Sequence, residues 1–148
     1  MYNTYVNDIR APRAGLFSLI HAAAAAQAHV ESRLASLGLS LPKLAALHHL
    51  TAAGGALPHG QLAERLSCVK SNITQLVDRL EADGLVTREA DSGDRRSRLA
   101  VITASGQKAY DQGTRLQQQA EKEVFSDLSD EESRHLAVLV GKVERHNR

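Results

Sequence analysis

The chain has 148 residues, enough for one domain with a hydrophobic core. Its 18 Lys and Arg residues nearly balance its 17 Asp and Glu residues, so overall charge does not attract it to nucleic acid, and any such binding must depend on local placement. One cysteine excludes an internal disulfide framework, and the sequence has neither a signal-peptide pattern nor an apolar run of membrane length. We therefore expect a cytoplasmic protein without a membrane partner.

The first predicted element is a long helix over residues 8–37. Its apolar or small residues recur at gaps of four and three, which is a heptad pattern. They are Leu16, Ile20, Ala23, Val30, Leu34 and Leu37, and Gln27 is the one polar member of the stripe. Such a stripe either packs in the core of the monomer or forms a dimer interface, and the pattern alone leaves both open. Gly38 follows where glycine commonly ends a helix.

A second helix is predicted from Ser40 to about Thr51. The Ser40 hydroxyl can cap its N-terminus, and Pro42 suits its first turn because that position needs no backbone N–H donor. The segment that follows, residues 52–58, contains two adjacent glycines and a proline, so we predict a loop there.

The next stretch, residues 59–86, carries two short helical periods around a tight turn that contains Cys68, and Gly84 ends the second period. Two short helices around such a turn are typical of a helix-turn-helix. Residues 85–90 and 97–103 then alternate as strands do, and the letters DSGDRR join them. A β-hairpin directly after a helix-turn-helix indicates a winged helix.

The C-terminal third is predicted to be helical. One helix runs from about Ala104 to about Asp127, and a capping box of Ser129 and Glu132 opens the last one. The expected fold is therefore mainly α with a small β-wing, a winged helix-turn-helix flanked by long helices.

The stretch QLAERLSCVKSNITQLVDRLEADGLVTREADSGDRRSRLAVIT, followed by Gly106, resembles the MarR family of bacterial winged-helix transcription regulators. The resemblance implies one domain over residues 1–148, with dimerisation helices at 8–37 and 104–148 and a DNA-binding lobe at 40–103. It also implies a homodimer that binds a pseudo-palindromic double-stranded DNA operator. Such regulators are usually repressors, released by a small, often phenolic or aromatic, ligand or by oxidation.

Residues at the N-terminal end of the second short helix are expected to reach base edges in the major groove. These are Val69, Lys70, Ser71, Asn72, Thr74 and Gln75. Asn72 or Gln75 can bond adenine with two hydrogen bonds, and Lys70 can meet guanine or phosphate. The family often has Arg at the position of Gln75 and Ser at the position of Val69. For Ser71 and Thr74, local helix capping is the alternative.

The wing supplies the second set of expected DNA contacts, Asp94, Arg95, Arg96 and Arg98. By resemblance, Arg96 enters the minor groove and Asp94 orients it. A narrow A·T-rich groove concentrates negative potential, which attracts arginine. The alternative for Arg95 and Arg96 is an exposed salt bridge, and Arg98 either reaches a phosphate or stays solvated.

Two weaker expectations concern phosphate. His59, Gly60 and Gln61 start a helix and can offer backbone N–H groups to a phosphate. Arg79 either meets a phosphate or pairs with Asp78 or Glu81 beside it, and the sequence favours the pair.

The family resemblance places an effector cavity between the dimerisation helices and the DNA-binding lobe, with Leu44, His48 and Tyr110 as candidate lining residues. The sequence has no tight metal-ligand spacing, phosphate loop or nucleophile–base motif, so we expect no metal, no cofactor and no enzyme activity. Cys68 sits in an apolar turn where nothing would lower its pKa, so redox sensing there is not expected.

An alternative function is a winged helix used for protein contact or for non-specific DNA binding. It would show no preference between an operator and random DNA. The near-zero net charge argues mildly against non-specific packing of DNA.

Overall fold

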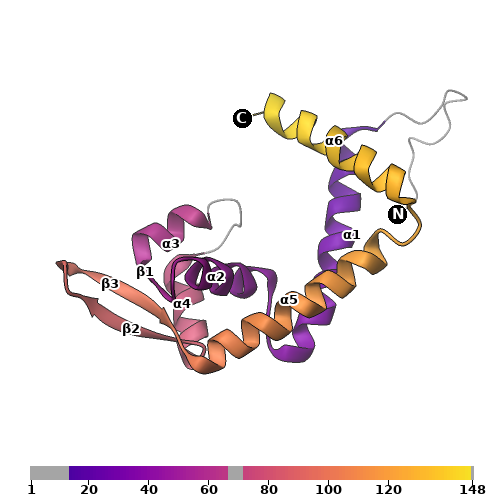
Figure 1. Ribbon diagram of the computed structural model, residues 1–148. Coiled ribbons are helices and arrows are strands. Elements are labelled where there is room, and N and C mark those ends of the chain that lie inside the picture. The colour runs from indigo at the N-terminus through magenta and orange to yellow at the C-terminus, as the bar shows by residue number, and fades with distance from the viewer. Residues whose placement is uncertain (1–13, 67–71, 148) are drawn as a thin grey trace, which may run out of the picture.

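The computed structural model describes residues 14–66 and 72–147. A lobe at one end of the molecule contains α2, α3, α4 and a small sheet, and an arm formed by α1, α5 and α6 extends from it (Figure 1). The elements in chain order are α1 (Leu16–Leu34), the 3-10 turn η1 (Ala35–Leu37), α2 (Leu41–Ala52), β1 (Ala56–Pro58), α3 (His59–Arg65), α4 (Ile73–Ala82), β2 (Val86–Asp91), β3 (Asp94–Ile102), α5 (Ala104–Val124) and α6 (Asp130–His146). The chain is thus a mainly helical winged helix, as the sequence predicts.

Several helix ends form for the local reasons that the sequence indicates. Gly38 adopts φ 68°, and Gly84 adopts φ 72°, a left-handed conformation that glycine adopts without strain. The Ser40 hydroxyl accepts a hydrogen bond from the Lys43 N–H at 3.3 Å, which caps α2. The Ser129 capping box of α6 is present as predicted. Residues 8–13 of the predicted first helix lie outside the described ranges.

The sheet is antiparallel, with strand order β1-β3-β2, so β3 is central. The prediction that residues 52–58 form only a loop is wrong. Residues 56–58 form β1, because they pair with β3 in a register that sets Leu57 opposite Ala100. Both residues are buried, so burial of Leu57 stabilises this short edge strand.

The hairpin of β2 and β3, here called the wing, has a tighter tip than predicted. The six residues DSGDRR were expected to be the connection, but β3 already begins at Asp94 and the turn is only Ser92–Gly93. The Asp91 carboxylate accepts a hydrogen bond from the Gly93 N–H at 2.9 Å, an aspartate turn that closes the hairpin early. Arg95 and Arg96 therefore lie on a strand, where their side chains point to opposite faces.

The core lies in the lobe and the adjoining end of the arm. The fully buried large side chains are Leu34, Leu47, Leu50, Leu62, Val77, Leu80 and Val86. Of the predicted stripe on α1, Val30 and Leu34 belong to this core, whereas Leu16 is 69% exposed and Ile20 is 50% exposed. Two residues of the stripe thus pack within the monomer, and its other four apolar or small residues are exposed.

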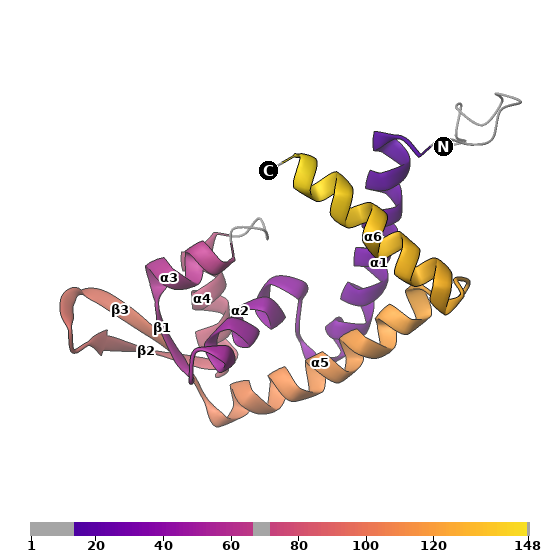
Figure 2. The same cartoon turned by 45° about the horizontal axis from the view of Figure 1, so that its top comes forward.

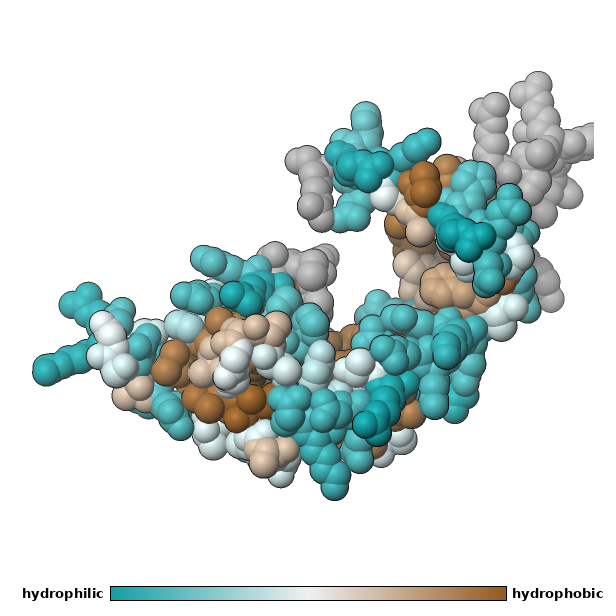
Figure 3. All heavy atoms as spheres, viewed as in Figure 1, coloured by the Kyte–Doolittle hydropathy of each residue, from teal (hydrophilic) through white to brown (hydrophobic). Residues whose placement is uncertain are grey.

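The arm carries further uncovered apolar side chains. α6 folds back from the end of α5 toward α1 (Figure 2), yet none of its described residues is buried. Leu136, Leu139, Val140 and Val143 are each at least 38% exposed. On the face drawn in Figure 3, apolar residues gather over α6 and the neighbouring part of α1. We call this surface, with Leu16, Phe17 and Ile20 of α1, the arm face. Within residues 14–66 and 72–147, no helix has both the length and the apolar composition to cross a membrane.

Candidate nucleic-acid interface

The second helix of the helix-turn-helix, α4, presents one face to the core and another to solvent. Leu76, Val77 and Leu80 are buried. The Asn72 side chain caps the helix, since its Oδ1 accepts from the N–H groups of Thr74 at 3.1 Å and Gln75 at 3.3 Å. The side-chain amide nitrogen of Asn72 is left to donate.

Three of the six predicted recognition residues can therefore be placed. Asn72, Thr74 and Gln75 are exposed at the N-terminal end of α4, on the side away from the core. The other three, Val69, Lys70 and Ser71, lie outside the described residues, as does Cys68.

Arg95, Arg96 and Arg98 of β3 are exposed, and none of them forms an ion pair within the described residues. Asp94 accepts a hydrogen bond from the backbone N–H of Arg96 at 2.9 Å, so it fixes the backbone there. In the described ranges no carboxylate lies within ion-pair distance of Arg95, Arg96 or Arg98. Their positive charges are thus directed to solvent, where an anionic partner can approach.

The predicted pairing of Arg79 with Asp78 or Glu81 is wrong. Both carboxylates pair instead with Arg88 of β2: Nη2 contacts Asp78 Oδ1, and Nη1 lies 3.5 Å from Glu81 Oε1. Adjacent residues of a helix diverge by about 100°, so Asp78 and Arg79 cannot share a side. The sequence analysis overlooked Arg88. The sequence pattern that indicates this pairing is two carboxylates three residues apart on a helix, followed by an arginine on the next strand.

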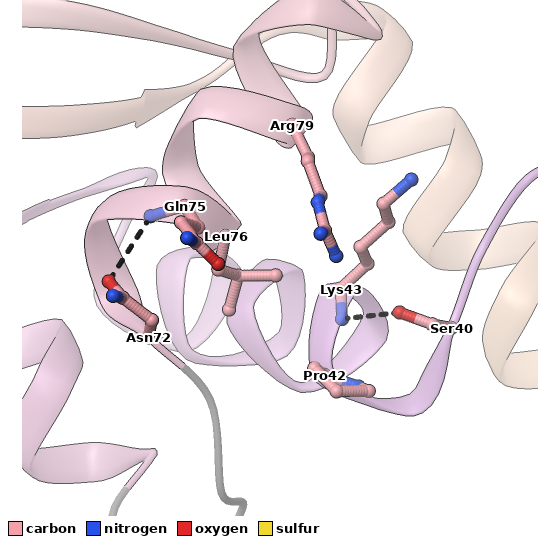
Figure 4. A pocket seen from close by; sticks show the side chains of 7 residues that line it. All are labelled: Ser40, Pro42, Lys43, Asn72, Gln75, Leu76 and Arg79. Carbon is pink, nitrogen blue, oxygen red and sulfur yellow. Dashed lines mark hydrogen bonds between the residues drawn. The ribbon is translucent and has the colours of Figure 1, made fainter.

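Arg79 borders a surface pocket between α2 and α4 with a volume of about 260 Å³. Figure 4 shows its guanidinium directed toward the start of α2. The lining residues are Ser40, Pro42, Lys43, Asn72, Gln75, Leu76 and Arg79. The Lys43 ammonium is already held by Asp83 Oδ2 at 2.7 Å and by Gly38 O at 3.1 Å. No carboxylate of the described residues pairs with Arg79.

The start of α3 contains the three residues predicted to meet phosphate. Gly60 and Gln61 are exposed, and the preceding Pro58 supplies no side-chain cap. His59 is half-buried, and its Nε2 is buried without a hydrogen-bond partner among the described residues. Burial, then the nearby charges of Arg88 and Arg98, lower the pKa of His59. His59 is therefore neutral near pH 7 and can offer a backbone N–H but not a positive charge.

The three predicted effector-pocket residues lie together where α2 meets α5. His48 Nδ1 and the Tyr110 hydroxyl are hydrogen-bonded at 3.0 Å, with ring centroids 5.9 Å apart. Leu44 is buried, and a Cβ on Gly113 would come within 2.8 Å of its Cδ1, so α2 and α5 pack closely there. Burial, then His48 and Arg65, lower the pKa of His49 beside this pair. The described residues contain no group of three potential metal ligands.

Known proteins resemble this chain in both sequence and fold. A model of the MarR family matches residues 37–97. PecS of Dickeya dadantii, an HTH-type transcriptional regulator, is 33% identical over 91 residues, which make up 62% of this chain and 55% of PecS. The chain thus spans about half the length of the curated relatives that it matches.

Two solved structures share nearly the whole architecture. A mutant of MarR from E. coli complexed with operator DNA has a TM-score of 0.75 at 25% identity, covering 86% of this chain and 92% of that one. The organohalide-sensing regulator RdhR in its 2,4-dichlorophenol-bound form has a TM-score of 0.75 at 22% identity, covering 93% of this chain and 87% of that one, a likeness that concerns the fold.

These relatives are named as transcriptional regulators and not as enzymes, which agrees with the expectation from the sequence. The family model covers the segment from the end of the first helix to the wing, and the structural likeness extends over the arm as well. The chain therefore resembles MarR-family transcription regulators in the sequence of residues 37–97 and in its fold.

Proposed function

We propose that the chain is a transcription regulator that binds double-stranded DNA through α4 and the wing. One observation carries this proposal: the exposed polar side chains at the start of α4 belong to the same lobe as Arg95, Arg96 and Arg98 of the wing, which form no ion pair within the described residues. A helix of this kind fits the major groove, and an arginine on a narrow hairpin fits the minor groove. The likeness to MarR complexed with operator DNA supports the same partner.

The proposed regulator is a homodimer that joins through the arm. The arm face leaves apolar side chains of α1 and α6 uncovered, and soluble monomers seldom expose a large contiguous patch of this kind. A second copy of the chain covers such a face with its own equivalent residues. Two lobes related by a two-fold axis match a pseudo-palindromic operator, with half-sites about one helical turn apart. A DNA partner also implies a cytoplasmic location.

The proposed regulation is release of a repressor by a small aromatic or phenolic ligand. The His48–Tyr110 pair offers a hydrogen-bonding partner for a carboxylate or phenol at the junction of lobe and arm. A ligand that prefers a different spacing of the two lobes lowers DNA affinity by the difference between its affinities for the two states. The phenol-bound RdhR structure has the same fold, which supports a ligand of this class.

The first experiment measures binding of the purified protein to DNA from just upstream of its own gene, against a scrambled duplex at one salt concentration. We expect selective binding with two chains per duplex. Equal binding to both duplexes, and no enriched sequence after selection from a random pool, would contradict the regulator proposal. It would favour the non-specific or protein-binding alternative.

A further inference from the structure

The start of the wing and the residue before it, Leu85, connect the hairpin to α4. Leu85 donates its N–H to Leu80 O at 2.9 Å, and Val86 is buried. Two residues further on, Arg88 crosses from β2 to α4 and contacts Asp78 and Glu81. Beyond Arg88, the hairpin toward its tip has no buried residue. Arg88 is thus the outermost contact between the wing and the helix.

The geometry of this contact allows one arginine to hold two carboxylates of α4. Asp78 and Glu81 are three residues apart, so their carboxylates lie on one side of α4. The guanidinium uses Nη2 for one and Nη1 for the other, and its planar fork holds these two contacts in a fixed geometry. The Arg88 side chain is only 25% exposed, so the sheet and helix hold it in place.

The neighbouring groups do not compete for this arginine. His59 and Arg98 face it from α3 and β3, and the Nε2 of His59 is buried without a partner in the described part of the chain. Arg98 is positively charged, and His59 is neutral near pH 7. The two carboxylates of α4 are therefore the anions that Arg88 contacts.

We propose that Arg88 is a positioning residue, which fixes the wing relative to α4 so that both reach adjacent grooves of one operator. This inference rests on the DNA-binding function proposed above. If the wing and α4 are already held in the arrangement that binds DNA, they do not have to lose conformational freedom when they bind. Arg88 acts through Asp78 and Glu81 and need not touch DNA.

Because these residues are charged, the proposal can be tested by whether a substitution weakens or strengthens DNA binding. Asp78 and Glu81 are carboxylates on a helix that faces phosphates. By charge alone, neutralising Asp78 should strengthen DNA binding, and it should also free Arg88 for a phosphate. A positioning role requires the opposite result on the operator.

The experiment compares Asp78→Asn, Arg88→Gln and the double variant with the unmodified protein, on operator and scrambled duplexes over a series of salt concentrations. We expect each single variant to weaken operator binding by about three- to tenfold, and the double variant to be no weaker than either. Asp78→Asn should bind the scrambled duplex at least as tightly as the unmodified protein does, because non-specific affinity follows charge. Glu64→Gln on α3 is the matched control, since it removes an exposed carboxylate that has no partner among the described residues.

A second measurement does not depend on DNA. Amide hydrogen exchange of residues 89–96 in the free protein should be faster in Asp78→Asn and Arg88→Gln than in Glu64→Gln. Unchanged exchange there would overturn the proposal, whatever the protein binds. The proposal would also be overturned if Asp78→Asn bound the operator as tightly as the unmodified protein or more tightly. The same holds if the salt dependence of operator binding showed that Arg88→Gln has lost about one phosphate contact, because Arg88 would then touch DNA itself. If the unmodified protein prefers no DNA, the proposed function fails, and the exchange result alone decides whether Arg88 fixes the wing.

Discussion

Glu123 of α5 binds Arg33 of α1 with both carboxylate oxygens, each 2.8 Å from Nη2, and His29 Nε2 lies 2.5 Å from the same carboxylate. These contacts join two helices of the arm. Hydrogen bonds from Arg33, then from His29, lower the pKa of Glu123. Its contribution to stability is therefore present above the ordinary value of 4.5 and is lost as pH falls through the lowered pKa.

We expect Glu123→Gln to lower the melting temperature at neutral pH, because the amide keeps the shape but loses the charge. The difference from the unmodified protein should shrink in high salt, which screens exposed pairs, and also as pH falls below 4.5. Thermal unfolding followed by circular dichroism measures both trends. A difference that persists at low pH would mean that the charge of Glu123 does not carry the contact.

Gly106 of α5 lies against the backbone that leads from α4 into the wing. A Cβ there would be 2.0 Å from Leu85 O, a distance that no side-chain adjustment relieves. We expect Gly106→Ala to destabilise the protein by about 2–3 kcal/mol, measured by urea unfolding. Gly60→Ala is the control, since nothing lies within 4 Å of its added Cβ. Equal stabilities of the two variants would show that α5 can shift away from Leu85 without cost.

Arg96 has an exposed side chain on the wing, with no ion pair in the described ranges. If it enters the minor groove, Arg96→Ala should weaken operator binding at least tenfold while the protein stays dimeric, because a lost charged contact costs about 1.5–3 kcal/mol. Fluorescence anisotropy at fixed salt measures the affinity. Arg115→Ala, which removes an exposed arginine from α5 outside the lobe, should bind as the unmodified protein does. Identical dissociation constants for both variants would remove Arg96 from the interface.

Leu139 lies in the middle of the uncovered apolar side of α6 and is 46% exposed. If a second copy covers the arm face, Leu139→Glu should convert the dimer to a monomer, because it buries an unpaired carboxylate in the contact. Light scattering coupled to size exclusion gives the mass. Arg134→Glu should leave the dimer intact. Arg134 lies five residues before Leu139, a rotation of about 500° around the helix axis, so its side chain is on the opposite side of α6. A Leu139→Glu protein that is still dimeric would place the contact elsewhere.

His59 predicts a pH dependence of folding. Its pKa in the folded protein is lowered from 6.5, so the unfolded chain takes up the proton first as pH falls. Its contribution to stability is complete above 6.5 and is lost as pH falls through the lowered value. Between about pH 7.5 and 5.5, the unmodified protein should lose more stability than His59→Gln does. Parallel curves for the two proteins would contradict the prediction.

The sequence predicts well what single residues determine locally. Gly38, Ser40, Gly84 and the Ser129 box mark the helix ends because each acts on its own backbone or within one turn. The family resemblance added the order of the elements and the residues of the lobe. All the predicted DNA contacts of α4 and the wing stay predictions, and Val69, Lys70 and Ser71 lie outside the described residues.

The sequence analysis missed the features that depend on contacts between distant segments. The strand β1 has three residues and one of them is Pro58, so it is recognisable only through its partner β3. The pairing of Arg79 was misjudged for the same reason, since local spacing cannot show that Arg88, ten residues beyond Asp78, reaches the same carboxylate. The extent of the wing tip likewise depends on the turn at Ser92–Gly93 and not on the composition of the segment.

A single residue, Thr103, separates the central strand β3 from α5. Its hydroxyl donates to Gly84 O at 2.7 Å and accepts from the Gly106 N–H at 3.0 Å. The angle between wing and arm is therefore fixed by Thr103 together with the close approach of Gly106 to Leu85, without a loop whose length could change. If the chain acts as the proposed dimer, the lobe and α5 of each subunit move together, and a different operator spacing requires one subunit to move against the other.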